Sequence, residues 1–263
     1  MKIFHRQIIS SYNKILFDVY REENLLCIAD NSIKIDDKSV LSFYYNAISP
    51  FTDPNNPTFY DSMINDIFNC SKDLKYCVGS LFLHKPHINN PLEQAFKIGD
   101  FNTFPNYQNI FDRRYSLYSS MASEKLYNYW DRIGDLLNAV LKVIDNKSKI
   151  YFHSVVDSIP EVLKNSENYK WLNSFKEDEF KEFNKIRKGV VHYRMLETEY
   201  SSKHLDALHD REAMEKLQSE KESYPSFYKD HLENTITGFE KTIQLIKEYN
   251  ELLGNKNEEN QAK

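Results

Sequence analysis

The stretch KLYNYWDRIGDLLNAVLKVIDN, residues 125–146, decides the fold class of this chain. Its apolar residues recur at alternating intervals of four and three positions, through Leu126, Trp130, Ile133, Leu137, Val140 and Ile144. This spacing keeps one apolar seam on the same side of an α-helix, facing a partner helix. The polar run Asp145-Asn146-Lys147-Ser148 ends the pattern. We therefore predict a long helix that packs along its whole length.

A second seam near the C-terminus provides the partner. The last long helix is predicted to start near Pro225, with the same seam at Leu232, Ile236, Phe239, Ile243, Ile246 and Leu253. Two such helices pack side by side at a shallow angle, and the segment 177–196 is expected to lie against them. The 263 residues contain only 6 Gly and 8 Pro, which is few for the tight turns of a sheet-rich protein. The expected fold class is an all-α helical bundle.

The rest of the chain divides into three parts. Residues 1–110 form an N-terminal helical region of unknown role, residues 111–254 form the bundle, and residues 255–263 form a tail without an apolar anchor, expected to be disordered. Shorter helices are predicted at residues 4–23, 39–48, 61–83, 152–164 and 206–221, with loop and short helix over residues 92–111.

Composition and charge indicate the compartment. The formal net charge is −5, so the whole chain is not a general attractor for nucleic acid. The N-terminus lacks a signal-peptide pattern, and no apolar run is long enough to span a membrane. Cys27, Cys70 and Cys77 have neither disulfide nor zinc spacing, and they are expected to be buried thiols. We expect a soluble cytoplasmic protein without a metal, a cofactor or a membrane contact.

Residues 181–194, KEFNKIRKGVVHYR, are a basic island in this acidic chain. They contain five Lys or Arg residues and one acidic residue. Within them an arginine, Arg187, is followed five positions later by a histidine, His192. Imidazole titrates near neutrality and can act as a general acid or base. Guanidinium stays charged and binds two phosphate oxygens at once. Both side chains therefore suit chemistry at a phosphate group, and Lys185, Lys188 and Arg194 add positive charge close to them in the sequence.

The motif on a helix of an all-α bundle resembles the HEPN superfamily, in which Arg-x4–6-His builds a metal-independent ribonuclease site. The resemblance covers about residues 115–254. It implies a HEPN-type bundle that cleaves RNA to 2′,3′-cyclic phosphate products, as a toxin or phage-defence effector. In such a site Arg187 and His192 would be catalytic, and Lys185, Lys188 and Arg194 would bind RNA. The resemblance also implies a homodimer and an antitoxin or regulatory partner. One departure is that Tyr193 follows His192 directly, whereas a related toxin group reads His-x-Tyr.

The spacing of the motif requires a physical explanation. Five residues of an ideal helix rotate by about 140°, so Arg187 and His192 do not share a face. Gly189 lies between them, where it can loosen or end a turn. The resemblance implies a different solution, in which two protomers bring their motifs to one cleft. Asp131 and Asp135 are candidates to orient Arg187, although a solvated face or an ion pair with Arg132 also explains them.

Simpler interpretations remain. Arg-x4-His occurs by chance in many proteins, so the alternatives are a catalytically inactive HEPN-like module that binds RNA or a protein partner, and a structural Arg–His pair. His84 and His87 lack a carboxylate partner for a metal, and His204 and His209 are expected at the surface. Trp130 and Trp171 are expected in the core or in a dimer contact.

Overall fold

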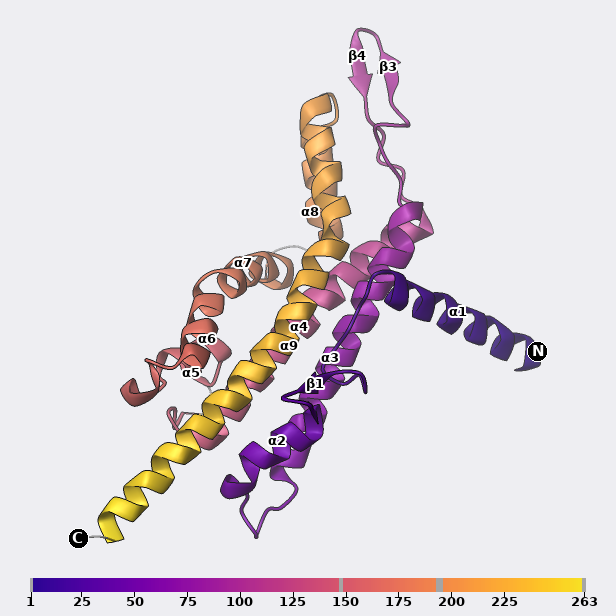
Figure 1. Cartoon of the computed structure of the whole chain (residues 1–263). Helices are drawn as coiled ribbons and strands as arrows, with labels where there is room; N and C mark the ends of the chain where they lie inside the picture. Colours follow the sequence, from indigo (N-terminus) through magenta and orange to yellow (C-terminus); the bar gives the residue numbers. More distant parts are fainter. Residues whose placement is uncertain (1, 147–148, 193–195, 262–263) are drawn as a thin grey trace. The chain divides into compact units, whose positions relative to one another are not determined.

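The computed structural model describes residues 2–146, 149–192 and 196–261 (Figure 1). Helices dominate, and the strands form two small antiparallel pairs, β1 with β2 and β3 with β4. The elements in chain order are α1 (Lys2–Glu22), β1 (Lys34–Ile35), β2 (Lys38–Ser39), α2 (Val40–Ile48), η1 (Ser49–Phe51), α3 (Phe59–His84), η2 (Lys85–His87), β3 (Phe96–Ile98), β4 (Phe101–Thr103), α4 (Ile110–Leu141), α5 (Phe152–Asp157), η4 (Glu161–Leu163), α6 (Glu167–Glu177), α7 (Glu179–His192), α8 (Leu196–Asp206) and α9 (Arg211–Gln261). The predicted all-α fold class is confirmed.

The chain forms two compact units, each built from separate stretches of sequence. Unit 1 comprises residues 1–26, 73–124 and 185–232, and unit 2 comprises residues 27–72, 125–184 and 233–263. The long helices α3, α4 and α9 contribute residues to both units.

Unit 2 has its core on the predicted seam of α4. Trp130 is fully buried, and its ring centroid lies 4.2 Å from that of Phe175 on α6 and 4.8 Å from that of Phe152 on α5. The second seam helix packs against it, because Tyr129 donates a hydrogen bond of 2.7 Å to the Thr235 carbonyl of α9. A Cβ at Gly238 would stand 2.3 Å from the Trp130 ring, so only glycine permits this approach.

Unit 1 pairs the other halves of the same two helices. Near the start of α4, Asp112 and Tyr115 both form hydrogen bonds with Lys221 of α9. Further along α4, Ser123 forms one with Tyr228, which is also further along α9. The two helices are therefore parallel here.

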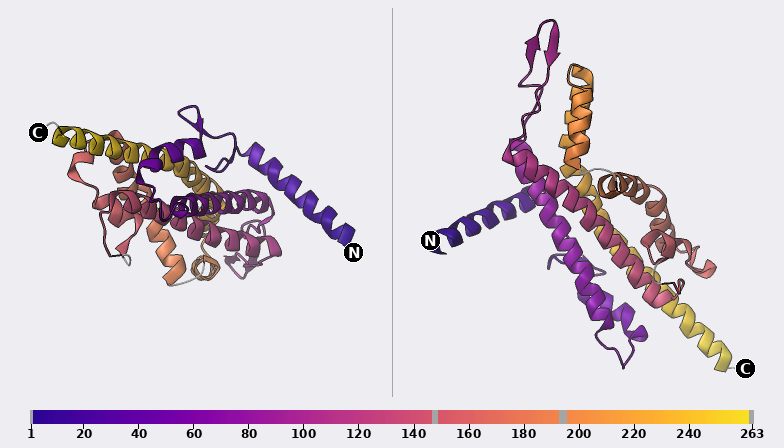
Figure 2. Two further views of the ribbon diagram at one scale, coloured as in Figure 1. Left: turned by 90° about the horizontal axis from the view of Figure 1, so that it is seen from below. Right: turned by 180° about the vertical axis from the view of Figure 1, so that it is seen from behind.

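A β-hairpin and α8 form the outer part of unit 1 and lie side by side in Figures 1 and 2. The hairpin pairs Phe96 with Thr103 and Ile98 with Phe101. The strand exit is fixed to α8, because Phe104 N–H donates to Leu208 O at 3.1 Å and the His204 ring nitrogen Nε2 lies 2.8 Å from Phe104 O.

Several boundaries differ from the sequence predictions, for local reasons. Residues 92–111 contain the β3–β4 hairpin rather than a short helix. The helix predicted over 152–164 ends at Asp157, since Pro160 follows and a helix rarely extends past the residue before a proline. The two helices predicted at 206–221 and from Pro225 are one continuous helix, α9, with Pro225 in its interior.

The proline is tolerated because its missing hydrogen bond is replaced. Pro225 has no N–H, so the carbonyl four residues earlier, that of Lys221, has no intrahelical donor. The buried Tyr115 hydroxyl donates to this carbonyl at 2.7 Å. At its other end α9 is helical to Gln261, past Gly254, where the sequence predicts a tail without order. The sequence of residues 255–263 contains no large apolar residue, and the disorder of this tail stays a prediction.

Candidate functional site

The basic island forms helix α7, which begins at Glu179 and ends at His192. Its first turns belong to unit 2, where Phe180 and Phe183 are buried. The Phe180 ring lies 5.1 Å from Phe152 and stacks at 6.4 Å on Tyr127 of α4, as centroid distances. Within unit 2 this segment therefore packs against the α4 seam helix, as expected.

Arg187 lies on the same side of α7 as the two buried phenylalanines. It follows Phe180 by seven positions and Phe183 by four, which is the spacing of one helix face. Arg187 is half-buried, whereas Lys185 and Lys188 are exposed. The Arg187 side chain therefore leaves α7 on its buried side, and the side chains of Lys185 and Lys188 leave it on the exposed side.

Helix α7 is not interrupted at Gly189. The helix continues through Gly189 to His192, so the predicted loosening of a turn at that glycine does not occur. Position 192 therefore follows the helix period and falls in line with the outward positions Lys185 and Lys188. The side chain of His192 lies outside the described part of the chain, as does Arg194. One α7 helix thus presents position 187 and position 192 about 140° apart.

The two candidate orienting acids have contacts on α4 and its neighbour α5. Asp135 Oδ2 lies 2.6 Å from Arg132 Nη1, in the ion pair that was the simpler interpretation of this residue. Asp131 Oδ1 lies 3.5 Å from the Phe152 backbone nitrogen, at the long limit of a hydrogen bond. Their predicted role toward Arg187 stays a prediction.

Two of the histidines singled out in the sequence, His84 and His204, are buried. The expectation that His204 lies at the surface is wrong, because the ring is fully buried and holds the hairpin exit through Phe104. His84 is also buried and stacks on Tyr118 at 5.6 Å between centroids. Burial, followed by the nearby charges of Arg114 and His87, lowers the pKa of His84. These rings are structural.

Over residues 2–146, 149–192 and 196–261, no group of three or more His, Cys, Asp or Glu side chains has an arrangement that could hold a metal ion. No described helix combines the length and apolar character that crossing a membrane requires.

Two further sets of residues have no sequence motif and were not predicted. One is the buried ion pair between Asp112 and Lys221 in unit 1, with 2.7 Å between Oδ1 and Nζ. The other is a groove along α1, described below. No local pattern identifies either set, because their members are distant in sequence and meet only through helix packing.

The helical fold and the basic helix α7 define the class of this protein, which is an α-helical protein with an arginine, Arg187, and a histidine, His192, on one helix. The family model of Cthe2314-like HEPN proteins matches residues 59–250, which is 192 of the 263 residues. The chain belongs to the HEPN family. The match begins at residue 59, well before residue 115, at which the resemblance described in the sequence analysis begins. Neither a curated protein nor a solved structure matches the chain. At the level of the family, membership indicates a nuclease-like or RNA-related role.

Proposed function

We propose that this protein is a metal-independent endoribonuclease of the HEPN type. The observation that carries the proposal is the position of Arg187 and His192 on one uninterrupted basic helix of a HEPN-family chain. The exposed Lys185 and Lys188 on the same helix support it, because they supply positive charge in a protein of net charge −5.

The proposed chemistry uses the RNA itself as the nucleophile. His192 removes the proton of a 2′-hydroxyl, and the 2′-oxygen attacks the adjacent phosphorus atom. The bond between phosphorus and the 5′-oxygen breaks, and that oxygen takes up a proton. The products are a 2′,3′-cyclic phosphate and a 5′-hydroxyl. Arg187 stabilises the charge on the phosphorane oxygens, and a positioned acid or base contributes about 10²- to 10⁴-fold in rate.

A second copy of the chain completes the proposed site. Since positions 187 and 192 of one regular helix diverge by about 140°, one protomer cannot direct both residues at the same phosphate from one helix face. Two α7 helices related by a two-fold axis would place the arginine of one beside the histidine of the other. Lys185, Lys188 and Arg194 would then attract the RNA backbone on both sides of the cleft.

We propose a toxin or phage-defence role in the cytoplasm, with an antitoxin or regulatory partner. The second candidate function is a catalytically inactive HEPN-like module that binds RNA or a protein partner. The half-buried, inward position of Arg187 favours it, because a guanidinium engaged inside its own protein would not reach a substrate.

The test compares single variants of the purified full-length chain. Arg187→Ala and His192→Ala should each reduce RNA cleavage by at least about 100-fold while circular dichroism stays unchanged. Lys216→Ala, at an exposed lysine on α9, is the matched control and should cleave normally. Cleavage by the wild type should be unaffected by EDTA. Wild-type protein that leaves RNA intact, but binds it equally well with and without the two substitutions, would establish the inactive module instead.

A further inference from the structure

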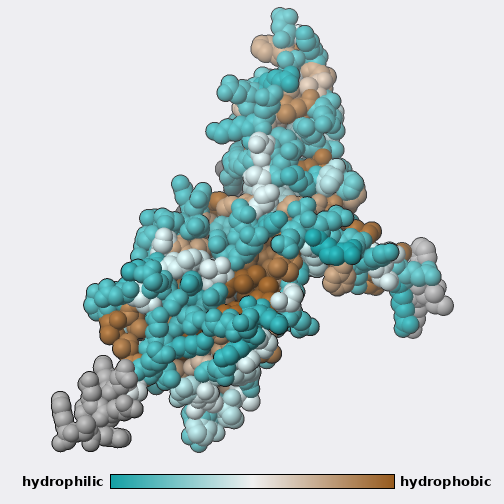
Figure 3. All heavy atoms as spheres, viewed as in Figure 1, coloured by the Kyte–Doolittle hydropathy of each residue, from teal (hydrophilic) through white to brown (hydrophobic). Residues whose placement is uncertain are grey.

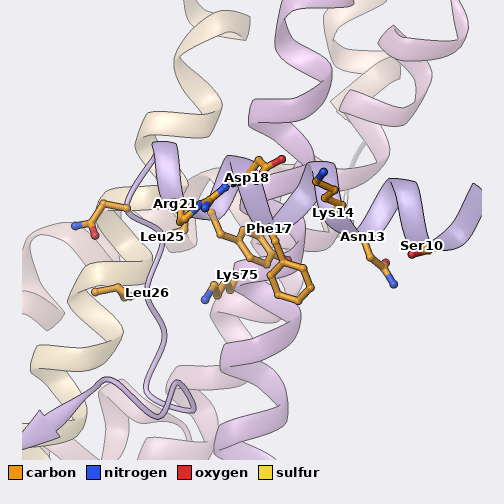
Figure 4. Close-up of a pocket in the computed structure, with 11 residues that line it drawn as sticks. Ser10, Asn13, Lys14, Phe17, Asp18, Arg21, Leu25, Leu26 and Lys75 are labelled. Carbon is orange, nitrogen blue, oxygen red and sulfur yellow. Dashed lines mark hydrogen bonds and ion pairs between the residues drawn. The ribbon is translucent and has the colours of Figure 1, made fainter.

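A groove runs along the C-terminal half of α1 in unit 1 and has a volume of about 710 Å³ (Figure 4). It is formed by α1, by the loop that follows it, and by Lys75 of α3. The size lies within the range of about 300–1,000 Å³ that is typical of small-molecule and cofactor sites. We call it the α1 groove, and all of its lining residues belong to one compact unit.

Close packing of α1 on α3 fixes the shape of the α1 groove. A Cβ at Gly79 would lie 2.4 Å from Cε1 of Tyr20, so the ring of Tyr20 rests directly on the α3 backbone. The chain turns back after α1 because Leu25 N–H donates to Tyr20 O at 2.8 Å. The wall that carries Tyr20 is therefore held by helix packing and is not a mobile loop.

The α1 groove combines an exposed aromatic ring with positive charge. Phe17 is 65% exposed, and its ring meets Tyr20 edge-on at 5.8 Å between centroids. Lys75 Nζ lies 4.8 Å from the centre of the Tyr20 ring, and Figure 4 shows Lys75 on the same side of α1 as Phe17. Lys14 and Arg21 also line the groove, and Asp18, which is the one acidic side chain among the described residues of its lining, is paired with Arg21.

Exposed apolar side chains continue along α1 outside the groove and are visible at the right of Figure 3. Ile8, Ile9 and Ile15 are each about half exposed or more. A purely apolar partner would fit those isoleucines, but the groove itself has three cationic lining residues against one anionic residue. Its charge complements an anion, and its exposed ring face suits a flat, unsaturated group.

We propose that the α1 groove binds a nucleotide unit, with its base stacked on Phe17 and its phosphate beside Lys75, which Figure 4 shows on the same side of α1 as Phe17. Sites for single-stranded nucleic acid combine these elements, a positively charged groove and aromatic rings on which bases stack. The ligand is either a segment of an RNA strand or a free nucleotide, since both offer a base and a phosphate. The lining residues of the α1 groove come from residues 10–26 and from Lys75, and none of them belongs to α7, so binding there does not depend on cleavage.

The experiment measures binding to the full-length wild-type chain with two probes. One is a short fluorescein-labelled 2′-O-methyl RNA, which has no free 2′-hydroxyl and cannot be cleaved. The other is adenosine monophosphate, followed by calorimetry. Phe17→Ala should weaken binding by about 5- to 150-fold, because stacking on one base typically contributes 1–3 kcal/mol. Phe17→Leu should weaken it nearly as much, since leucine keeps the apolar volume but removes the ring face.

A lysine variant tests the phosphate contact. Lys75→Ala should lower the slope of log affinity against log salt by about 0.7, the value for one phosphate contact of a single strand. Ile9→Ala, on the same helix but outside the groove, is the matched control and should bind normally. Circular dichroism of each variant confirms that α1 stays folded.

The outcomes separate the two ligand sources and the two proposals. A loss at Phe17→Ala with the labelled RNA alone identifies a strand, and the same loss with adenosine monophosphate identifies a free nucleotide. Unchanged binding of both probes to Phe17→Ala, or full binding to Phe17→Leu, would overturn the inference. If wild-type protein cleaves no RNA but its binding still depends on Phe17, the α1 groove stands and the ribonuclease proposal fails. If cleavage depends on Arg187 and His192 but substitution of Phe17 has no effect on binding, the ribonuclease proposal stands and the α1 groove proposal fails.

Discussion

Replacement of Tyr115 by phenylalanine should destabilise unit 1 by removing the hydrogen bond that substitutes for the missing N–H of Pro225. The tyrosine is 1% exposed, and its hydroxyl donates to the Lys221 carbonyl at 2.7 Å. A buried polar group that loses its partner costs about 1–3 kcal/mol. We therefore expect Tyr115→Phe to reduce the free energy of unfolding by about 2 kcal/mol.

A double-mutant cycle isolates the cause. Pro225→Ala restores a backbone N–H, which can donate to the Lys221 carbonyl in the ordinary helical pattern. In that background Tyr115→Phe should cost only about 0.5–1 kcal/mol, because the carbonyl keeps one donor. Pro225→Ala alone should stabilise the protein, since proline inside a helix is about 3 kcal/mol less favourable than alanine.

Urea unfolding provides the measurement, followed by far-ultraviolet circular dichroism and by tryptophan fluorescence. Both tryptophans, Trp130 and Trp171, lie in unit 2, so fluorescence reports on the unit that lacks Tyr115. A shift seen by circular dichroism but not by fluorescence would show that the two units unfold separately. The reasoning is refuted if Tyr115→Phe costs the same with proline and with alanine at position 225.

Three more predictions follow from buried groups. Lys221→Met should lower the free energy of unfolding in urea by about 3–5 kcal/mol, because it leaves the Asp112 carboxylate buried without its cation. Adding Asp112→Asn should recover most of this loss. A cost below about 1 kcal/mol would mean that the pair behaves like a surface ion pair. Gly238→Ala should lower the free energy of unfolding by about 1–3 kcal/mol and change the tryptophan fluorescence, because the added methyl group overlaps the Trp130 ring on α4. The control is Gly254→Ala on the same helix, where a methyl group meets nothing within 4 Å, and this variant should be neutral or stabilising. Burial lowers the pKa of His231 to about 4, below the value near 6.5 of an unfolded chain, so the unfolded state binds the proton first and stability should fall by about 3 kcal/mol as the pH drops from 6.5 to 4. His231→Phe should flatten that dependence, and an unchanged pH profile in this variant would contradict the assignment.

The candidate site was only partly predictable from sequence. The motif and its basic surroundings stand within fourteen consecutive residues, so they can be recognised without a fold. Whether α7 ends at Gly189 or continues through it could not be predicted, because a glycine in a helical pattern does either, depending on what packs around it. Likewise His204 stands in a charged stretch, and only the docking of Phe104 on α8 buries it.

The local pattern of residues is enough to predict the fold class, the two seam helices and the position of Arg187 and His192 on one helix. These features are periodic over short distances, and a single helix expresses its period without knowledge of its partners. Three further features depend on how the helices pack: the continuity of α9 through Pro225, the pairing of Asp112 with Lys221, and the assembly of the α1 groove. Each of these joins side chains or backbone groups from elements that are far apart in the chain. Their energies come from burial and hydrogen bonding that exist only once the helices have packed.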